Sequence, residues 1–174
     1  KPDVPTLETS LHVVENSPNT IHTCTGYLGS PRGSFKIEVN KTDTLNFQEY
    51  PSHLHSGEET VTNMACGVYV EYKFGLSLPS NFNLSTVRCR AENDYSSSSG
   101  DLLVSNSEVI TLIPDGYCND ISTGFKHHPL GCGYYVECAN GIIYGRPASP
   151  TLCFNFAKNE SDNCLNVPEC SGTT

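Results

Sequence analysis

Residues 124–141 read GFKHHPLGCGYYVECANG, and this stretch decides the fold of the C-terminal part of the chain. Asn140-Gly141 stands between two segments of alternating polarity, 134–139 and 142–146. Both residues tolerate positive φ, which a two-residue turn between antiparallel strands requires. The stretch therefore predicts a β-hairpin.

The alternation of side chains along a strand predicts which residues of this hairpin face outward. Tyr135 and Glu137 share one face, and Tyr134, Val136 and Cys138 share the other. A cysteine in a disulfide must point inward to its partner. We therefore expect Tyr135 to lie on the outer face, with Tyr134 partly exposed because so small a domain has little interior.

Cysteines are concentrated around the hairpin. Six of the nine lie between Cys118 and Cys170. This density is typical of a domain too small to be held together by hydrophobic burial alone, and it indicates a disulfide framework formed outside the reducing cytosol. Six cysteines allow fifteen pairings, and the sequence alone does not choose among them.

The six cysteines follow the spacing C-x13-C-x5-C-x14-C-x10-C-x5-C. Together with the run from Gly124 to Gly141, this spacing resembles the type 2 chitin-binding domain of peritrophins and tachycitin. The resemblance covers about 55 residues. It implies binding of chitin and three disulfides: Cys118 with Cys138, Cys132 with Cys170, and Cys153 with Cys164.

Chitin presents flat faces of ring C–H groups flanked by acetamides, so a binder needs aromatic platforms beside amide or hydroxyl partners. The candidates are Tyr135, Tyr144 and Phe154 as platforms, with Asn140 and Asn155 as polar partners. For Tyr144 and Asn155 a purely structural role is an equal alternative, and Phe156 is expected in the small core. The sequence Cys153-Phe-Asn-Phe departs from the family pattern and alters the loop beside the expected sugar site.

The first 113 residues have an all-β pattern. Short apolar and β-branched runs alternate with Gly, Pro, Asn and Ser clusters, without a sustained 3.6-residue period. The expected strands are 10–14, 20–25, 34–39, 68–78, 85–91 and 108–113. Their spacing favours a sandwich of two antiparallel sheets.

Cys24 and Cys89 each lie within an expected strand, where a bridge between the two sheets would form. The segments 20–24 and 83–91 resemble the cysteine-bearing strands of immunoglobulin-like domains. The resemblance implies a disulfide between Cys24 and Cys89. The chain has no Trp to pack on this bridge, so Phe35 or Ile37 is expected to fill the space.

Pro114-Asp-Gly interrupts the chain just before the cysteine-rich part. We therefore expect an immunoglobulin-like β-sandwich over 1–113 and the chitin-binding module over 114–174. The polar segment 95–101 is either an exposed loop between the last two strands or a disordered linker.

Three N-x-S/T sequons, at Asn40, Asn83 and Asn159, indicate N-glycosylation and agree with the cysteine content in pointing to a secreted protein. The start at Lys1 favours a processed signal peptide. The formal net charge of −9 and dispersed basic residues argue against nucleic acid or an anionic membrane as partner. No run of 18 apolar residues is present to span a membrane.

Cys66 is left without an evident partner. Three interpretations are open: a disulfide to a second chain, which is slightly favoured and would give a homodimer or a link to another protein, a free thiol, or an adduct. His53, His55, His127 and His128 are not interpreted as a metal site. No cluster of further ligands accompanies His53 and His55, and the resemblance to the chitin-binding domain implies a structural role for His128-Pro129. Catalytic motifs and cofactor-binding motifs are absent, so we expect neither an enzyme nor a cofactor.

The order of the two domains resembles that of variable-region-containing chitin-binding proteins. The resemblance implies a secreted, non-enzymatic protein that binds chitin or another N-acetylglucosamine polymer, in innate immune recognition or surface tethering. The alternative is an extracellular structural or assembly protein of a shell, cuticle, egg coat or larger complex. In that case the chitin-binding-like module makes protein contacts.

Overall fold

The structure, a computed structural model, describes residues 1–10, 12–42 and 46–170. Its elements are almost all β-strands, and the chain folds into two compact units. The first unit comprises 1–11 and 16–110, and the second comprises 12–15 and 111–174. In the part of the chain that is described, no helix is long and apolar enough to cross a membrane.

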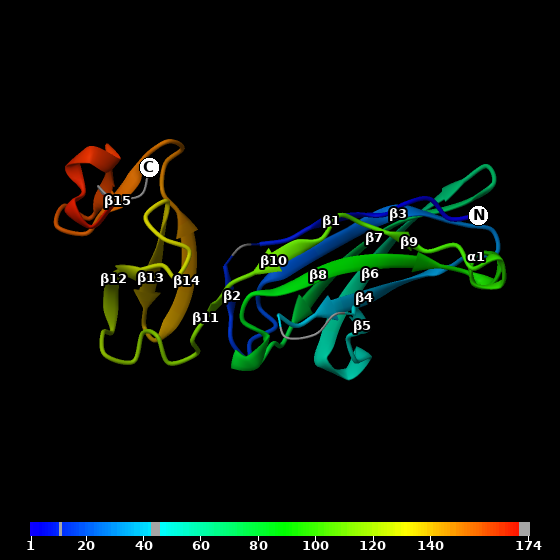
Figure 1. Ribbon diagram of the computed structural model, residues 1–174, viewed down its shortest axis with the longest axis horizontal. Helices are drawn as coiled ribbons and strands as arrows, with labels where there is room; N and C mark the ends of the chain where they lie inside the picture. Colours follow the sequence, from blue (N-terminus) through cyan, green and yellow to red (C-terminus); the bar gives the residue numbers. More distant parts are fainter. Residues whose placement is uncertain (11, 43–45, 171–174) are drawn as a thin grey trace. The chain divides into compact units, whose positions relative to one another are not determined.

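The first unit is a sandwich of two antiparallel sheets (Figure 1). One sheet has the order β1 (Thr6–Glu8), β3 (Ile21–Gly29), β7 (Gly67–Leu76) and β6 (His55–Met64). The other has the order β10 (Glu108–Ile110), β8 (Ser85–Glu92), β4 (Ser34–Asn40) and β5 (Gln48–Glu49), and β9 (Leu103–Val104) also pairs with β8. Two 3₁₀ turns, η1 (Ser52–Leu54) and η2 (Ser80–Phe82), precede β6 and β8.

This strand order is the arrangement of an immunoglobulin-like fold, and it confirms the expected all-β class. The Cys24–Cys89 disulfide joins β3 to β8, and both cysteines are fully buried. Leu28, Val70 and Ala91 pack in the core, with Phe35 against them. Phe35 therefore occupies part of the apolar interior in a chain that has no Trp.

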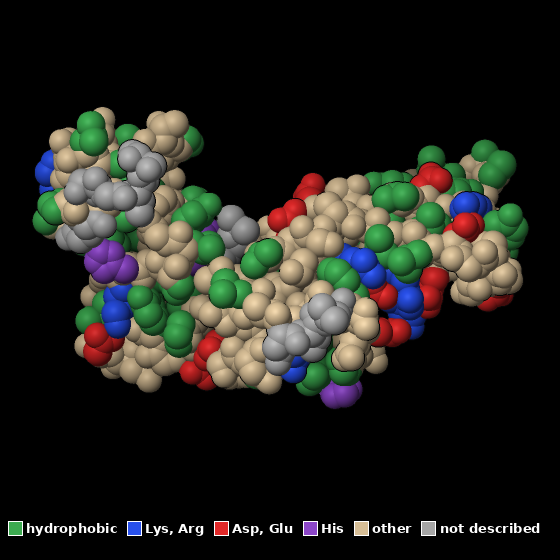
Figure 2. All heavy atoms as spheres, in the orientation of Figure 1, with side chains coloured by type: hydrophobic (Ala, Val, Ile, Leu, Met, Phe, Trp, Pro, Cys, Tyr) green, Lys and Arg blue, Asp and Glu red, His purple; other side chains and the backbone are tan. Residues whose placement is uncertain are grey.

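The outer face of the β4–β8 sheet carries charged side chains that pair with one another. Glu38 is only 5 % exposed and pairs with both Arg88 and Arg90, at 2.8 and 3.2 Å. Lys36 and Glu92 extend the network. Figure 2 shows basic and acidic side chains intermingled over these strands. The charges are thus compensated locally on this face.

Besides the short strands β1, β5 and β9, two larger features of the first unit were not expected from the sequence. β6, at 55–64, was not among the expected strands. The polar segment 95–101 is neither a plain loop nor a linker, because most of it lies in a short helix, α1 (Asp94–Ser99). Asn93 and Ser96 cap its start reciprocally, and Gly100 ends it at φ 71°.

The second unit is built from three small sheets. β12 (Thr123–His127), β13 (Tyr134–Ala139) and β14 (Ile142–Pro147) form an antiparallel sheet. β2 (Val13–Val14) pairs in parallel with β11 (Leu112–Ile113), and β15 (Cys153–Asn155) pairs with β16 (Glu160–Asp162). Two 3₁₀ turns, η3 (Cys164–Asn166) and η4 (Pro168–Cys170), follow. Asn140 and Gly141 have φ of 52° and 78°, as the predicted hairpin turn requires.

The expected division after residue 113 differs from the two units of the structure at two places. Residues 12–15 and 111–113 belong to the second unit. Ile113 is buried with Cys118, Val136 and Cys138. Residues 13–14 belong to the second unit because β2 pairs with β11. The expected strand 10–14 is therefore only β2, and its residue 11 lies outside the described residues.

His22 is a buried titratable group in the core of the first unit. Its side chain is fully buried against Phe74, with ring centroids 5.4 Å apart, and neither ring nitrogen has a hydrogen-bond partner among the described residues. Burial lowers the pKa of His22 to about 4, because the charged imidazolium would lose its hydration without gaining a partner.

This burial predicts acid sensitivity of the sandwich. Below pH 6.5 the unfolded chain binds a proton at His22, whereas the folded chain stays neutral until pH is near 4. Folding stability is therefore lost as pH falls through this window, by about 2 kcal/mol at pH 5. Denaturant unfolding of wild type and His22→Phe at pH 7.5 and pH 5 measures the effect. Equal pH dependence in the two proteins would contradict it.

Candidate functional site

The outer face of the β13–β14 hairpin brings two tyrosines and two charged residues together. Tyr135 lies opposite Arg146, and Glu137 lies opposite Tyr144. Side chains that lie opposite one another on an antiparallel pair share a face, so the four form a compact group with the tyrosines on one diagonal. The inner face carries Val136 and Cys138, both fully buried. The predicted orientation of Tyr135 is thus the one in the structure.

The two charged residues of this group form an ion pair beside Tyr144. The Arg146 Nε donates to Glu137 Oε2 at 3.1 Å, and its guanidinium lies 5.3 Å from the centroid of the Tyr144 ring. Tyr144 is 39 % exposed, so its ring remains accessible to a ligand. The arrangement offers aromatic surface beside hydrogen-bonding groups, which is the chemistry that sugar recognition uses.

A cluster of aromatic rings packs against Tyr135 on the same face of the sheet. The Phe154 ring stacks on Tyr135, with centroids 4.1 Å apart and planes inclined by 23°. Phe125 meets Tyr135 edge-on at 5.6 Å and also packs against Phe154. Phe156 extends the cluster and lies 3.9 Å from the His127 ring. Tyr135 is partly buried as a result, and its orientation is fixed by packing.

The structure corrects the expected roles of Phe154 and Asn155 as surface contacts. Phe154 is 4 % exposed and Asn155 is 5 % exposed. Asn155 folds the turn after β15, because its Oδ1 accepts from the backbone N–H of Ala157 and its Nδ2 donates to the Asp162 carboxylate. Neither side chain presents a surface to a polymer: Phe154 packs β15 against Tyr135 of the hairpin, and Asn155 stabilises the turn between β15 and β16.

The remaining candidates lie at accessible positions. Asn140 is exposed at the hairpin turn, one residue beyond the end of β13. Glu137 and Arg146 were not candidates, although strand periodicity places Arg146 on the same face as Tyr144. Each lies two positions along its strand from an expected aromatic platform, Glu137 from Tyr135 and Arg146 from Tyr144, so the same periodicity identifies both.

The inner face of the same sheet packs against His12, which lies beside β2. His128 Nδ1 accepts from the backbone N–H of Leu130 at 3.0 Å, so its Nε2 carries the proton and donates to His12 Nδ1 at 3.1 Å. Burial and the neighbouring His12 lower the pKa of His128 to about 4. Gly145 is required here, because a Cβ would overlap the His12 ring.

The disulfides of the second unit fix these strands. They join Cys118 to Cys138, Cys132 to Cys170 and Cys153 to Cys164, the same pairs that the family resemblance implied. Cys66 is exposed and unbridged in the turn between β6 and β7. Among the described residues, no group of three or more His, Cys, Asp or Glu side chains is placed to hold a metal ion.

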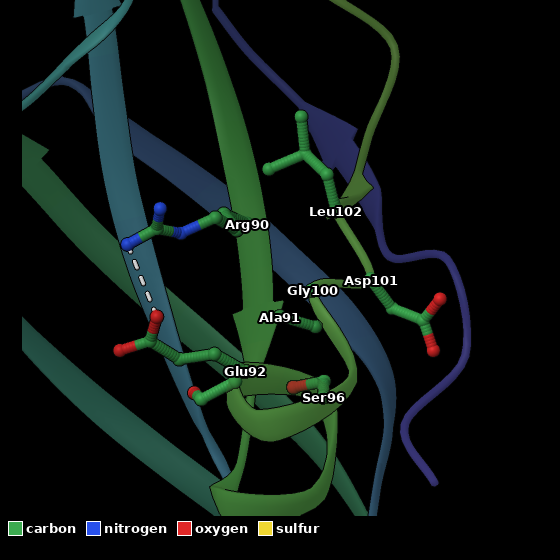
Figure 3. A pocket seen from close by; sticks show the side chains of 8 residues that line it. Arg90, Ala91, Glu92, Ser96, Gly100, Asp101 and Leu102 are labelled. Carbon is green, nitrogen blue, oxygen red and sulfur yellow. Dashed lines mark ion pairs between the residues drawn. The ribbon is translucent and has the colours of Figure 1, made fainter.

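The first unit contains a pocket of about 220 Å³ beside α1. Figure 3 shows the Arg90 and Asp101 side chains pointing away from one another. Arg90 pairs with Glu38 and Glu92, and Asp101 pairs with Lys1. The charged groups of the lining are thus engaged in ion pairs, Arg90 and Glu92 with one another, and do not converge on a ligand position. The pocket is lined by Arg90, Ala91, Glu92, Ser96, Ser97, Gly100, Asp101 and Leu102.

No protein-family model matches the chain, and no curated protein matches it. Among solved structures, the chain is similar to the full ectodomain of mouse nectin-like molecule 4, which has three Ig domains. The TM-score is 0.41 at 14 % sequence identity, and the match covers 84 % of this chain. The chain corresponds to 44 % of the length of that ectodomain.

Proposed function

We propose that the chain is a secreted, non-enzymatic binding protein whose second unit binds chitin or another N-acetylglucosamine polymer. The observation that carries the proposal is the pair of tyrosines on the outer face of β13 and β14, which they share with the Glu137–Arg146 ion pair. Tyr144 supplies an open ring and Tyr135 a fixed one, while the charged pair offers donors and acceptors for sugar hydroxyls and acetamides.

Four disulfides support an extracellular location, because such bonds persist outside the reducing cytosol. The sequons agree with it: Asn83 and Asn159 are exposed and Asn40 is partly exposed. A role in innate immune recognition or surface tethering rests on the domain order, with the second unit anchoring the protein and the sandwich facing other molecules.

Replacement of Tyr144 by Ala tests sugar binding. Loss of the exposed ring is expected to lower affinity for chitin beads roughly tenfold, about 1.4 kcal/mol, without unfolding the protein. Tyr144→Phe keeps the ring and should be retained almost as well as wild type. Leu165→Ala, a matched control, removes a side chain that is 78 % exposed on η3, outside the hairpin.

Two results of this pulldown would overturn the proposal. One is wild-type protein that chitin beads do not retain. The other is Tyr144→Ala retained as strongly as Tyr144→Phe. Soluble N-acetylglucosamine oligomers, added as competitors, separate specific elution from non-specific adhesion to the beads.

The exposed Cys66 favours a second candidate function, covalent assembly in an extracellular structure. Cys66 lies at the tip of the β6–β7 hairpin, near Met64, which is 55 % exposed. A thiol at a protruding turn is accessible to a thiol of another chain. In this function the second unit makes protein contacts and does not bind sugar.

Electrophoresis without reductant tests this assembly. Protein secreted from an oxidising compartment is expected to migrate at twice the reduced mass, or at the combined mass with a partner. Cys66→Ser should migrate as a single chain under the same conditions. A wild-type protein that runs as a single chain without reductant excludes covalent assembly through Cys66.

A further inference from the structure

β6 is a long, exposed edge strand. Its ten residues pair with β7 in one continuous register, from His55 opposite Leu76 to Met64 opposite Gly67. No strand of the described residues covers its other side, and every residue of β6 after His55 is exposed. The other strands at the ends of the two main sheets, β1, β5 and β10, have only two or three residues each.

The features that normally protect an edge strand are missing from β6. It contains no Pro and no Lys, and its register against β7 has no bulge. Its two carboxylates lie beside basic groups of the same chain: Glu59 pairs with Arg32, and Glu58 lies opposite Lys73, whose ammonium pairs with Glu71. Alternate backbone N–H and C=O groups therefore face outward along the whole strand, and its two carboxylates restrict only the register in which a second strand can pair.

Glycosylation does not protect this edge either. The sequon residues Asn40 and Asn83 lie at the end of β4 and just before β8, in the opposite half of the sandwich. Asn159 belongs to the second unit. No sequon lies on any strand of the sheet that ends in β6.

We propose that β6 pairs antiparallel with β6 of a second copy of this chain, around a twofold axis at Thr60. The inner-face residues of one copy must lie opposite inner-face residues of the other, so the axis passes through a residue position. An axis at Glu58 or Glu59 would set two identical carboxylates directly opposite one another, which is destabilising.

The axis at Thr60 pairs positions 56 to 64 of the ten-residue strand, the longest overlap that avoids this repulsion. Glu58 then lies opposite Thr62 of the second copy, and Glu59 lies opposite Val61. The two Thr60 side chains meet at the axis, and Thr–Thr pairs are favourable across antiparallel strands. Two four-stranded sheets thereby become one continuous sheet.

This dimer is independent of both proposed functions. In the Thr60 register, Cys66 of one copy lies beyond the paired segment, opposite residue 54 of the other. The two Cys66 residues are then about twelve residue positions apart along the strand direction, roughly 40 Å. They cannot bridge within this dimer, so a disulfide through Cys66 would join the chain to a different partner.

Engineered disulfides test the register. In a Cys66→Ser background, Thr60→Cys places two thiols directly opposite at the axis, where Cβ atoms are about 4.5–5.5 Å apart. Mild oxidation should convert this variant to a covalent dimer. Thr62→Cys is the matched control, because its thiols would be about four residue positions apart along the strands, roughly 13 Å. It should remain a single chain, and Glu58→Cys combined with Thr62→Cys should cross-link again.

Sedimentation equilibrium of the protein without introduced cysteines measures the association itself. The Cys66→Ser protein should dimerise reversibly, and Thr60→Lys, which sets two ammonium groups opposite one another, should raise the dimer dissociation constant at least about tenfold. A strictly monomeric protein, a dimer insensitive to Thr60→Lys, or equal cross-linking of Thr60→Cys and Thr62→Cys would each overturn the proposal.

Discussion

The Cys118–Cys138 disulfide is the constraint on which the second unit depends. It holds Cys138 in the interior, and because side chains alternate along β13, it also fixes Val136 inward and Tyr135 and Glu137 outward. A slip of one residue would exchange the two faces. Such a bridge contributes roughly 2–4 kcal/mol, a large share of the stability of a small domain. The chemistry offered to a ligand therefore follows from the position of one cysteine.

The outer face gains its rigidity from a second layer of structure. Phe154 stacks on Tyr135, and β15, which carries Phe154, begins at Cys153. The Cys153–Cys164 bridge and the turn bonds of Asn155 hold that strand in place. The departure from the family pattern around Cys153 thus does not remove aromatic residues from the fold. It assigns Phe154 to support, and leaves Tyr144 as the exposed ring.

The central strands of the sandwich were predicted well from the sequence, and segments that depend on capping or on distant partners were not. β8 alternates buried and partly buried residues, and β3, β4 and β7 each contain several buried residues; the expected strands coincide with these four apart from their ends. α1 was missed because its sequence is a run of serines, and reciprocal capping by Asn93 and Ser96 stabilises it in place of an apolar stripe. The parallel pairing of Val13–Val14 with Leu112–Ile113 joins segments about one hundred residues apart, which no local pattern encodes. On the hairpin, periodicity alone indicated the face of Tyr135, but burial of Phe154 and Asn155 required the position of β15.

The absence of β6 from the expected strands has the same physical origin as its proposed role. A strand with one face against a core alternates apolar and polar residues, whereas HSGEETVTNM has little apolar content on either face. It forms because β7, which is buried on one face, supplies a complete ladder of partners. A strand ordered by one neighbour and exposed on its other side has unsatisfied backbone groups that only solvent or another strand can pair. The polar composition of β6 therefore explains both why the sequence does not predict a strand there and why the strand is available to a second copy.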